Sequence, residues 1–337
     1  GDGEMYLGSD AIALSHLTDK ISYLDEGDRV EISRNSAQVF DENGAEVDRE
    51  IHTVDAASGS IDKGNYKHFM MKEIYEQPTV VGQTLGTLID PLKGHVGRGC
   101  MPFDLAEIDR VTIIACGTSY YAAMVAKYWL EQVGRINVDV DIASEYRYRE
   151  PVMPAGGLSI FISQSGETAD TLAAVKLAKS RGAFVFGVCN VVGSSIARET
   201  DTGAYTHAGP EIGVASTKAF TTQITTLACM ALSLATKNNN LSDDQIHKLT
   251  AILRKIPSQS SIAIEKCEKL VQSIAVDIKD HDHMLYLGRG LLYPTALEGA
   301  LKLKECAYIH AEGYAAGELK HGPIALIDEQ MPVAVLA

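Results

Sequence analysis

The sequence predicts an α/β protein with parallel β-sheets flanked by helices, and three observations support this fold class. Apolar strand-like runs alternate with helical stretches from residue 110 onward, which favours a parallel sheet covered on both faces. Turns rich in Ser, Thr and Gly follow two of these runs. A strand–turn–helix unit at 111–131 is echoed at 283–305, roughly 170 residues later, which is typical of two copies of one unit.

Length, charge and cysteine usage limit the class of protein. A chain of 337 residues is longer than one core usually serves, so we expect two or more domains. The formal net charge of −14, without basic clusters, excludes a typical nucleic-acid-binding protein. No apolar run approaches the roughly 18 residues of a membrane span, and there is no signal peptide. The six cysteines show neither CxxC pairs nor zinc-like spacing, which predicts reduced thiols in a cytoplasmic protein without a metal site.

The N-terminal stretch is expected to be rich in β-strands. ISYLDEGDRVEIS and AQVFDENGAEVDRE place strand-like runs around EGD and ENG turns. Residues 55–66 are polar and rich in Gly and Ser, which predicts a linker. The next segment, KHFMMKEIYEQP, predicts a helix that stops before Pro78, because the residue before a proline disfavours the helical conformation.

The central region is expected to hold the first complete sheet. Its predicted strands are 110–115, 136–142, 157–162 and 184–191. Its predicted helices are 120–134, 169–182, 221–236 and 243–280, with CGTS (116–119) as a tight turn after the first strand.

The turn SQSGET (163–168) leaves a predicted strand and at once presents three hydroxyls and an amide: Ser163, Ser165, Thr168 and Gln164. One of its hydroxyls can cap the following helix, which is worth about 1 kcal/mol. The same turn can bind an anion, because ligands of open α/β sheets lie outside the carboxyl ends of the strands and a helix N-terminus offers free amides. A single hydroxyl is enough for a cap, so four polar side chains favour the anion site.

Two further polar turns precede predicted helices. CGTS offers Thr118 and Ser119, and its place after a neighbouring strand supports a shared anion site. In EIGVASTKAFTTQ (211–223), Ser216 or Thr217 can cap the next helix, with contact to a substrate as the alternative. Lys218 either adds positive charge to such a site or is simply solvated.

The stretch EGALKLKECAYIHAEGYAAGELKHGP (298–323) carries the candidate acid–base groups. Glu298, Lys302 and Glu305 share one face of a predicted helix. A surface ladder of salt bridges is one interpretation. The flanking Ala, Leu, Cys and Ile residues favour a largely buried helix, where charged groups usually have a functional reason. His321, in the turn LKHGP, is a further candidate acid or base.

Five motifs, in this order and spacing, resemble the isomerase half of the glutamine–fructose-6-phosphate aminotransferase (glucosamine-6-phosphate synthase) family: CGTS, ISQSGETADT, EIGVASTKAFTTQ, ALEGALKLKE and AEGYAAGELKHGP. The match covers residues 66–337, and residues 1–50 resemble the end of the family's glutaminase domain. The resemblance implies two sugar isomerase domains, the second one incomplete. It sets these boundaries: 1–55 glutaminase remnant, 56–100 linker and lead-in helix, 101–241 first sugar isomerase domain, 242–273 connecting helices, and 274–337 second sugar isomerase domain.

The resemblance also implies a reaction. The family converts fructose 6-phosphate and glutamine-derived ammonia to glucosamine 6-phosphate, the first step of hexosamine synthesis, and its isomerase half works as a homodimer. By motif match, the sugar phosphate would be held by Ser163, Gln164, Ser165 and Thr168, with Thr118 and Ser119 nearby, while Val214 and Ser216 would line the sugar site.

The same motif match implies the catalytic roles. Glu305 would move a proton between C1 and C2 of the sugar, and Lys302 would assist at the sugar oxygens. The partner subunit's His321 would help to open the sugar ring. The resemblance implies neither a metal nor an organic cofactor, because the imine supplies the electron sink.

The chain departs from the family pattern at two places. The family's glutaminase nucleophile is an N-terminal cysteine, and none of the six cysteines here takes that place. The family's imine-forming lysine lies near the C-terminus, so neither Lys302 nor Lys320 is assigned that role. We therefore expect an internal piece of a longer synthase that by itself binds sugar phosphate poorly and does not turn over.

Two other functions stay open on the sequence alone. A sugar-phosphate isomerase or deaminase of the same fold would also need a phosphate-binding turn and acid–base groups. A non-catalytic regulator that senses a phosphosugar would need SQSGET but not Glu305, Lys302 and His321.

Overall fold

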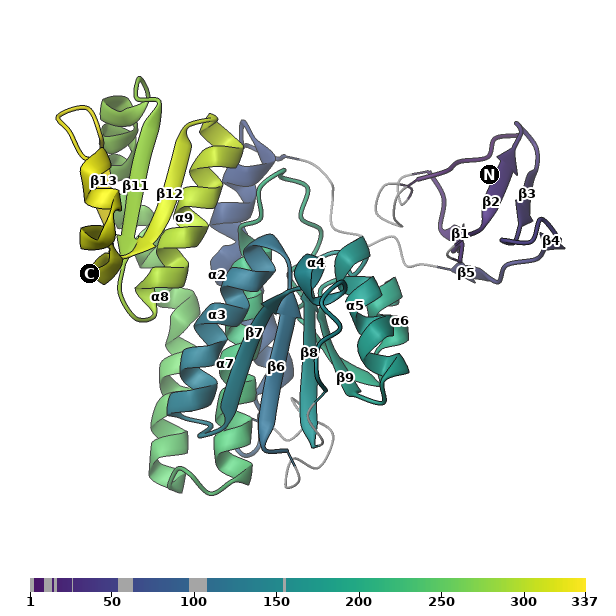
Figure 1. Ribbon diagram of the computed structural model, residues 1–337, viewed down its shortest axis with the longest axis horizontal. Coiled ribbons are helices and arrows are strands. Elements are labelled where there is room, and N and C mark those ends of the chain that lie inside the picture. The colour runs from purple at the N-terminus through teal and green to yellow at the C-terminus, as the bar shows by residue number, and fades with distance from the viewer. Residues whose placement is uncertain are drawn as a thin grey trace. The chain divides into compact units, whose positions relative to one another are not determined.

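The computed structural model describes residues 3–8, 14, 17–25, 27–53, 63–96, 108–153 and 156–337. The chain divides into two units, Gly1–Asp62 and Lys63–Ala337 (Figure 1). Most of the predicted linker at 55–66, the expected domain boundary at 101 and Cys100 lie outside the described residues.

The N-terminal unit consists of short antiparallel strands, as the EGD and ENG turns predict. One sheet has the order β2-β3-β4, and a separate pair joins β1 to β5. The strands are β1 Lys20–Ser22, β2 Arg29–Ile32, β3 Ala37–Phe40, β4 Glu46–Val47 and β5 Ile51–Thr53. Arg49 donates from Nε and Nη2 to the Asp28 carboxylate at 2.9 and 2.8 Å, which ties the β4–β5 connection to the turn before β2.

The second unit is built on five parallel strands in the order β10-β9-β8-β6-β7. They are β6 Arg110–Ala115, β7 Asn137–Ile142, β8 Gly157–Ser163, β9 Phe184–Cys189 and β10 Thr202–Tyr205. The four predicted strands are confirmed within two residues at each end. β8 and β9 are apolar runs buried on both faces, whereas the edge strand β7 alternates apolar and polar residues. The edge strand β10 was not predicted, since its sequence TGAY is short and only partly apolar.

Alternate residues of the strands face two separate cores. Val111, Ile113 and Leu158 pack in one core with helices α2, α3 and α7, whereas Ile114 and Phe161 pack in the other with α4, α5 and α6. Figure 1 shows these two helical layers on opposite faces of the sheet. The helices are α2 Phe69–Leu88, α3 Gly117–Gln132, α4 Ala143–Tyr146, α5 Ala169–Ser180, α6 Ser195–Glu199 and α7 Lys218–Lys237.

The C-terminal part of this unit follows the long helix α8 (Asp243–Ile278) and holds a three-stranded parallel sheet. Its order is β12-β11-β13, with α9 connecting β11 to β12. The elements are β11 His283–Gly288, α9 Leu292–Ala307, β12 His310–Ala315, the short 3₁₀ helices η2 Ala316–His321 and η3 Pro323–Leu326, and β13 Val333–Val335. This order matches β7-β6-β8 of the main sheet, with α9 in the place of α3.

Helix α2 does not stop before Pro78, so that prediction is wrong. The helix continues to Leu88 with Pro78 inside it. A proline has no N–H, so the carbonyl of Ile74 loses its normal helical partner. The side chain of Gln77 replaces that partner, because its Nε2 donates to the Ile74 carbonyl at 3.0 Å. A side-chain amide one position away thus satisfies the carbonyl that the proline leaves without a backbone donor.

If this side-chain bond replaces the missing backbone bond, Gln77→Ala should destabilise the protein mainly when residue 78 is proline. The change leaves the Ile74 carbonyl without a donor and should lower the free energy of unfolding by about 1 kcal/mol. In a Pro78→Ala background, the restored amide can serve Ile74, so Gln77→Ala should cost less than half as much. Urea unfolding of the four chains, followed by fluorescence of the single tryptophan, Trp129, gives this double-mutant cycle. Equal costs in both backgrounds would show that the Gln77 bond does not compensate for the proline.

The described residues include one helix, α7, that is long and apolar enough to cross a membrane by length and composition. The prediction that no segment approaches that length therefore does not hold for α7. Of its apolar stretch, 72% is buried inside the protein, between α2, α3 and the sheet. This burial accounts for its composition, because a core helix is apolar all round.

Candidate functional site

The two polar turns of the main sheet lie at its topological switch point. β6 and β8 are neighbours, and Ala115 at the end of β6 lies opposite Ile162 near the end of β8. From β6 the chain continues through α3 on one face of the sheet, and from β8 it continues through α5 on the other. Ligands of open α/β sheets bind outside the carboxyl ends of the strands at such a point. The topology therefore directs a ligand to the turns that carry CGTS and SQSGET.

The SQSGET turn is ordered by its own hydroxyls. The Ser163 Oγ accepts a hydrogen bond from the Gly166 amide at 3.0 Å and lies 2.9 Å from the Thr168 Oγ1. The Ser165 Oγ accepts from the Glu167 amide at 3.1 Å. Ser163 is buried, and the other two hydroxyl residues are half-buried. The turn thus folds around Ser163 and leaves the oxygens of Ser165 and Thr168 within reach of a ligand.

Backbone contacts anchor this turn to the next strand and to α6. The Gln164 carbonyl accepts from the Asn190 amide at 3.1 Å, and the Gly166 carbonyl accepts from the Ile196 amide at 2.9 Å. Gly166 has a φ of +70°, and a Cβ there would lie 2.0 Å from the Ser194 Oγ. Only glycine fits this position, because it needs both a left-handed backbone and the absence of a side chain.

The helix-cap interpretation of SQSGET is wrong for α5. Thr168 occupies the N-cap position, but its side chain makes no capping hydrogen bond. No described residue accepts a hydrogen bond from the backbone amides of the first helical turn, which belong to Ala169, Asp170 and Thr171. A helix N-terminus with free amides and a positive dipole end favours an anion.

CGTS is the start of α3 rather than a separate turn, because helical bonding already begins with the Tyr120 amide donating to the Cys116 carbonyl at 3.3 Å. This helix end also lacks a side-chain cap. It contacts α5 through Thr171, whose Oγ1 lies 3.9 Å from the Cys116 Sγ. It contacts α7 through Ser119, whose Oγ accepts from the Gln223 Nε2 at 3.0 Å. The start of α3 is therefore the centre around which the other elements of the site gather.

Thr118 connects this helix end to the acid–base residues of α9. Its Oγ1 donates to the Glu298 Oε1 at 3.1 Å and lies 3.4 Å from the Lys302 Nζ. Lys302 lies 3.5 Å from Glu298 and also pairs with Glu305. The side chains of Glu298, Lys302 and Glu305 are 8%, 19% and 33% exposed. The predicted shared face is confirmed. The ion pairs form a ladder, as the alternative interpretation had it, but this ladder is largely shielded from solvent at Glu298 and Lys302.

The environment of Glu298 changes its acidity. Burial raises the pKa of its carboxyl from 4.5 to about 7, although Lys302 and Thr118 act in the opposite direction. Such a group is partly protonated at neutral pH and can exchange a proton. Lys302 also pairs with Glu305, the second carboxylate on this helix face. The side chain of Glu305 is more exposed than that of Glu298, so the two carboxyls lie in different environments.

The raised pKa predicts how stability depends on pH. A carboxyl whose pKa is higher in the folded state stabilises the fold below pH 4.5, and this stabilisation is lost as pH rises through about 7. Glu298→Gln removes this dependence, so the variant should gain up to about 3 kcal/mol relative to the wild type between pH 4 and pH 8. Urea unfolding at several pH values measures the difference. Glu131→Gln, at an exposed ion pair of α3, is the matched control, and an equal pH slope in both variants would contradict the prediction.

The structure does not bring every predicted residue to this cluster. His321 is exposed at the end of η2 and makes no hydrogen bond or ion pair with a described residue. Val214 is 96% exposed, and Ser216 is half-buried, both in the loop before α7. No group of three or more His, Cys, Asp or Glu side chains suited to a metal ion occurs among the described residues.

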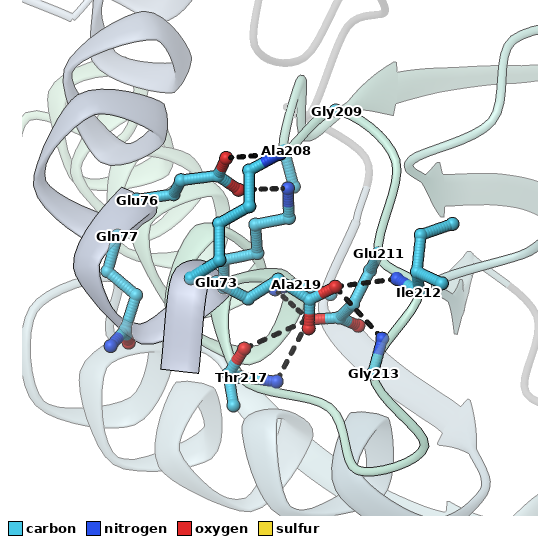
Figure 2. Close-up of polar contacts among 12 residues, drawn as sticks. Glu73, Glu76, Gln77, Ala208, Gly209, Glu211, Ile212, Gly213, Thr217 and Ala219 are labelled. Atoms are coloured by element: carbon cyan, nitrogen blue, oxygen red, sulfur yellow. Dashed lines mark hydrogen bonds and ion pairs between the residues drawn. The ribbon is translucent and has the colours of Figure 1, made fainter. Parts of the chain in front are cut away.

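The loop before α7 is capped by a carboxylate rather than by Ser216 or Thr217. The Glu211 Oε1 accepts from the amides of Thr217 and Ala219 at 2.9 and 3.1 Å (Figure 2). The side chain of Thr217 makes no cap of its own. Lys218 is not solvated, since it is buried and its Nζ lies 2.7 Å from the Glu76 Oε2 on α2. The N-terminus of α7 is therefore occupied by negative charge and is a poor place for a phosphate, unlike those of α3 and α5.

Three residues at or beside the site had no role in the sequence prediction: Glu73, Glu211 and Gln223. One pattern could have indicated Glu73, which falls on the apolar face of α2 at a spacing of seven residues from Val80. Nothing in the sequence connects Gln223 to Ser119, which is 104 residues away.

Comparisons with known proteins agree with this arrangement. The family model described as "SIS domain" matches residues 104–233 and 277–337. The chain is 54% identical over its whole length to a protein of Zymomonas mobilis named glutamine–fructose-6-phosphate aminotransferase [isomerizing]. It covers 55% of that relative, so the chain spans about half the length of the curated relatives it matches.

Two solved structures are similar in fold and sequence. The C-terminal domain of glucosamine-fructose-6-phosphate aminotransferase from Francisella tularensis has a TM-score of 0.78 and 46% identity, covering 82% of this chain and 77% of that one. Glucosamine-6-phosphate deaminase from Thermotoga maritima has a TM-score of 0.61 and 25% identity, covering 80% and 76%. The chain belongs to the glutamine–fructose-6-phosphate aminotransferase [isomerizing] family and carries its SIS-domain region.

Proposed function

We propose that this chain is the isomerase part of an enzyme that makes glucosamine 6-phosphate from fructose 6-phosphate and glutamine-derived ammonia. The observation that carries the proposal is the start of α3, where Thr118 contacts the acid–base residues of α9 beside two uncapped helix ends. A phosphate at the helix ends fixes one end of the sugar, and proton transfer acts at the other.

The proposed roles follow this division. Ser163, Ser165 and Thr168, with Gln164 and the start of α3, hold the phosphate. Val214 and Ser216 line the sugar site. Glu305 takes a proton from C1 of the ketose imine and returns it to C2, which gives the 2-amino aldose. Lys302 assists at the sugar oxygens, and the partner subunit's His321 helps to open the ring in a homodimer. The exposure of His321 and its lack of contacts with described residues support an intersubunit role.

The proposal includes the organisation of the full-length protein. The N-terminal unit would be the end of a glutaminase domain, since the Zymomonas mobilis relative aligns over the whole of this chain. Residues 101–241 and 274–337 would be two copies of one sugar isomerase domain, joined by residues 242–273, and their matching strand order supports this. We place the protein in the cytoplasm, where its sugar-phosphate substrate is made.

The comparison with a deaminase keeps one rival function testable. The Thermotoga maritima structure, titled a glucosamine-6-phosphate deaminase, shares the fold. A deaminase would release ammonia from glucosamine 6-phosphate, whereas a synthase forms glucosamine 6-phosphate when glutamine is supplied. A regulator would bind the phosphosugar but would catalyse neither the release of ammonia nor the formation of glucosamine 6-phosphate.

The experiment gives the full-length protein fructose 6-phosphate and glutamine and measures glucosamine 6-phosphate. Formation of the product supports the proposal, and the 337-residue chain alone should form none. Ammonia release from glucosamine 6-phosphate without the forward reaction would favour the deaminase. Calorimetry with fructose in place of fructose 6-phosphate is the control for the phosphate site, because fructose should not bind measurably.

A further inference from the structure

A buried acidic residue outside the catalytic cluster holds the loop that presents Val214 and Ser216. Glu73 lies on α2 and is 2% exposed. Its Oε1 accepts from the amides of Ile212 and Gly213 at 2.6 and 2.9 Å, across about 140 residues of sequence. Figure 2 shows this carboxylate directed at the loop from the neighbouring helix.

The second oxygen of Glu73 has an unusual environment. Its Oε2 is buried and has no hydrogen-bond partner among the described residues. A Cβ on Gly213 would lie 2.5 Å from this oxygen, so the loop needs glycine in order to approach the carboxylate so closely. Burying an unpaired carboxylate oxygen is costly, and such costs are usually found at functional sites.

The loop is held at both ends by carboxylates. Glu73 binds the amides at its start, and Glu211 binds the amides of Thr217 and Ala219 at its end. Between these two sets of hydrogen bonds, Ala215 is buried while the side chain of Val214 is exposed to solvent. The two bound ends leave few backbone conformations for the intervening residues, so the direction of Val214 is set in advance of binding.

We infer that Glu73 is a positioning residue, which acts through the loop 211–217 to hold Val214 and Ser216 for the sugar. This role rests on the proposed function. The inference gives helix α2 a part in sugar affinity, although α2 lies about 140 residues before the loop in the sequence. Glu76, one turn further along α2, binds Lys218 and not the loop amides, so it provides a matched comparison.

The kinetic test uses the full-length protein. Glu73→Ala should raise KM for fructose 6-phosphate about tenfold while kcat changes less than about threefold, because the acid–base groups on α9 are untouched. Glu73→Gln keeps a carbonyl acceptor for both amides and should restore most of the affinity. An unchanged KM in Glu73→Ala, or a Gln variant as weak as the Ala variant, would overturn the inference. If Glu73→Ala does not fold, Glu73→Asp, with its shorter reach, gives the same comparison.

A second measurement does not depend on activity. In the wild-type 337-residue chain, the amides of Ile212 and Gly213 should exchange their hydrogens slowly. Exchange of these two amides should be at least about tenfold faster in Glu73→Ala and should keep the wild-type rate in Glu76→Gln. Faster exchange without a change in KM would mean that the hydrogen bonds of Glu73 stabilise the loop but do not affect sugar binding, which overturns the inference. A wild-type protein without turnover but with protected amides would instead contradict the proposed function.

Discussion

Replacing Glu305 by glutamine in the full-length protein should lower kcat by about 10²–10⁴-fold, the usual contribution of a general base. The amide keeps the size of the side chain and its place beside Lys302, but it cannot accept a proton from C1 of the sugar. In the proposed arrangement the phosphate is held at α3 and α5, so KM for fructose 6-phosphate should change by less than about threefold. Initial rates of glucosamine 6-phosphate formation measure both constants.

A neighbouring charge on the same helix provides the control. Lys304 is exposed and lies outside the cluster, so Lys304→Gln should keep the wild-type kcat. A regulator that only senses the phosphosugar would respond alike to both changes. If Glu305→Gln kept more than half of the turnover, the assignment of the base would be wrong.

Replacing Gly166 by alanine should abolish sugar-phosphate binding and destabilise the fold. The added Cβ would lie 2.0 Å from the Ser194 Oγ and 2.4 Å from its Cβ, in a backbone with φ of +70°. The left-handed conformation alone costs about 1–3 kcal/mol for a residue other than glycine. Relief of the clash must move the turn, and with it Ser163 and Thr168. We expect a loss of affinity for fructose 6-phosphate of at least about 100-fold, because misplaced phosphate ligands no longer act together.

Gly182 separates backbone strain from the clash. It has a φ of +78°, but a Cβ there would meet nothing within 4 Å. Gly182→Ala should therefore show only the loss of stability that comes from strain, with unchanged sugar-phosphate affinity. Calorimetric titration and urea unfolding of both variants provide the comparison. Wild-type affinity in Gly166→Ala would contradict the placement of the phosphate at this turn.

Much of the sheet could be predicted because β6, β8 and β9 are largely apolar runs and β7 alternates apolar and polar residues, patterns that depend on local sequence alone. The same holds for the shared face of Glu298, Lys302 and Glu305, since helical spacing fixes which residues are neighbours. Both predictions need only short-range periodicity, and for that reason they agree with the structure.

The failures involve contacts that periodicity does not encode. A proline often ends a helix, but α2 continues past Pro78, and the Gln77 side chain donates to the Ile74 carbonyl that the proline leaves without its helical donor. The cap of α7 comes from Glu211, several residues before the helix, so the usual search for a hydroxyl at the N-cap selected the wrong residues. Glu73 finds its partners about 140 residues away, and only the folded chain brings them together.

The site was predicted in part for a similar reason. SQSGET and CGTS follow neighbouring parallel strands, so their proximity follows from the sheet topology. The hydrogen bond of Thr118 to Glu298 joins helices α3 and α9, which belong to the two separate sheets, and no pattern within either stretch indicates it.

The measurement that tests the account most directly is a crystal structure of the full-length protein with fructose 6-phosphate bound. The account predicts phosphate oxygens within about 3.2 Å of the Ser165 and Thr168 hydroxyls and of the first amides of α5, with C1 of the sugar next to the Glu305 carboxylate. A phosphate bound at the N-terminus of α7, or a sugar whose C1 lies far from Glu305, would contradict it.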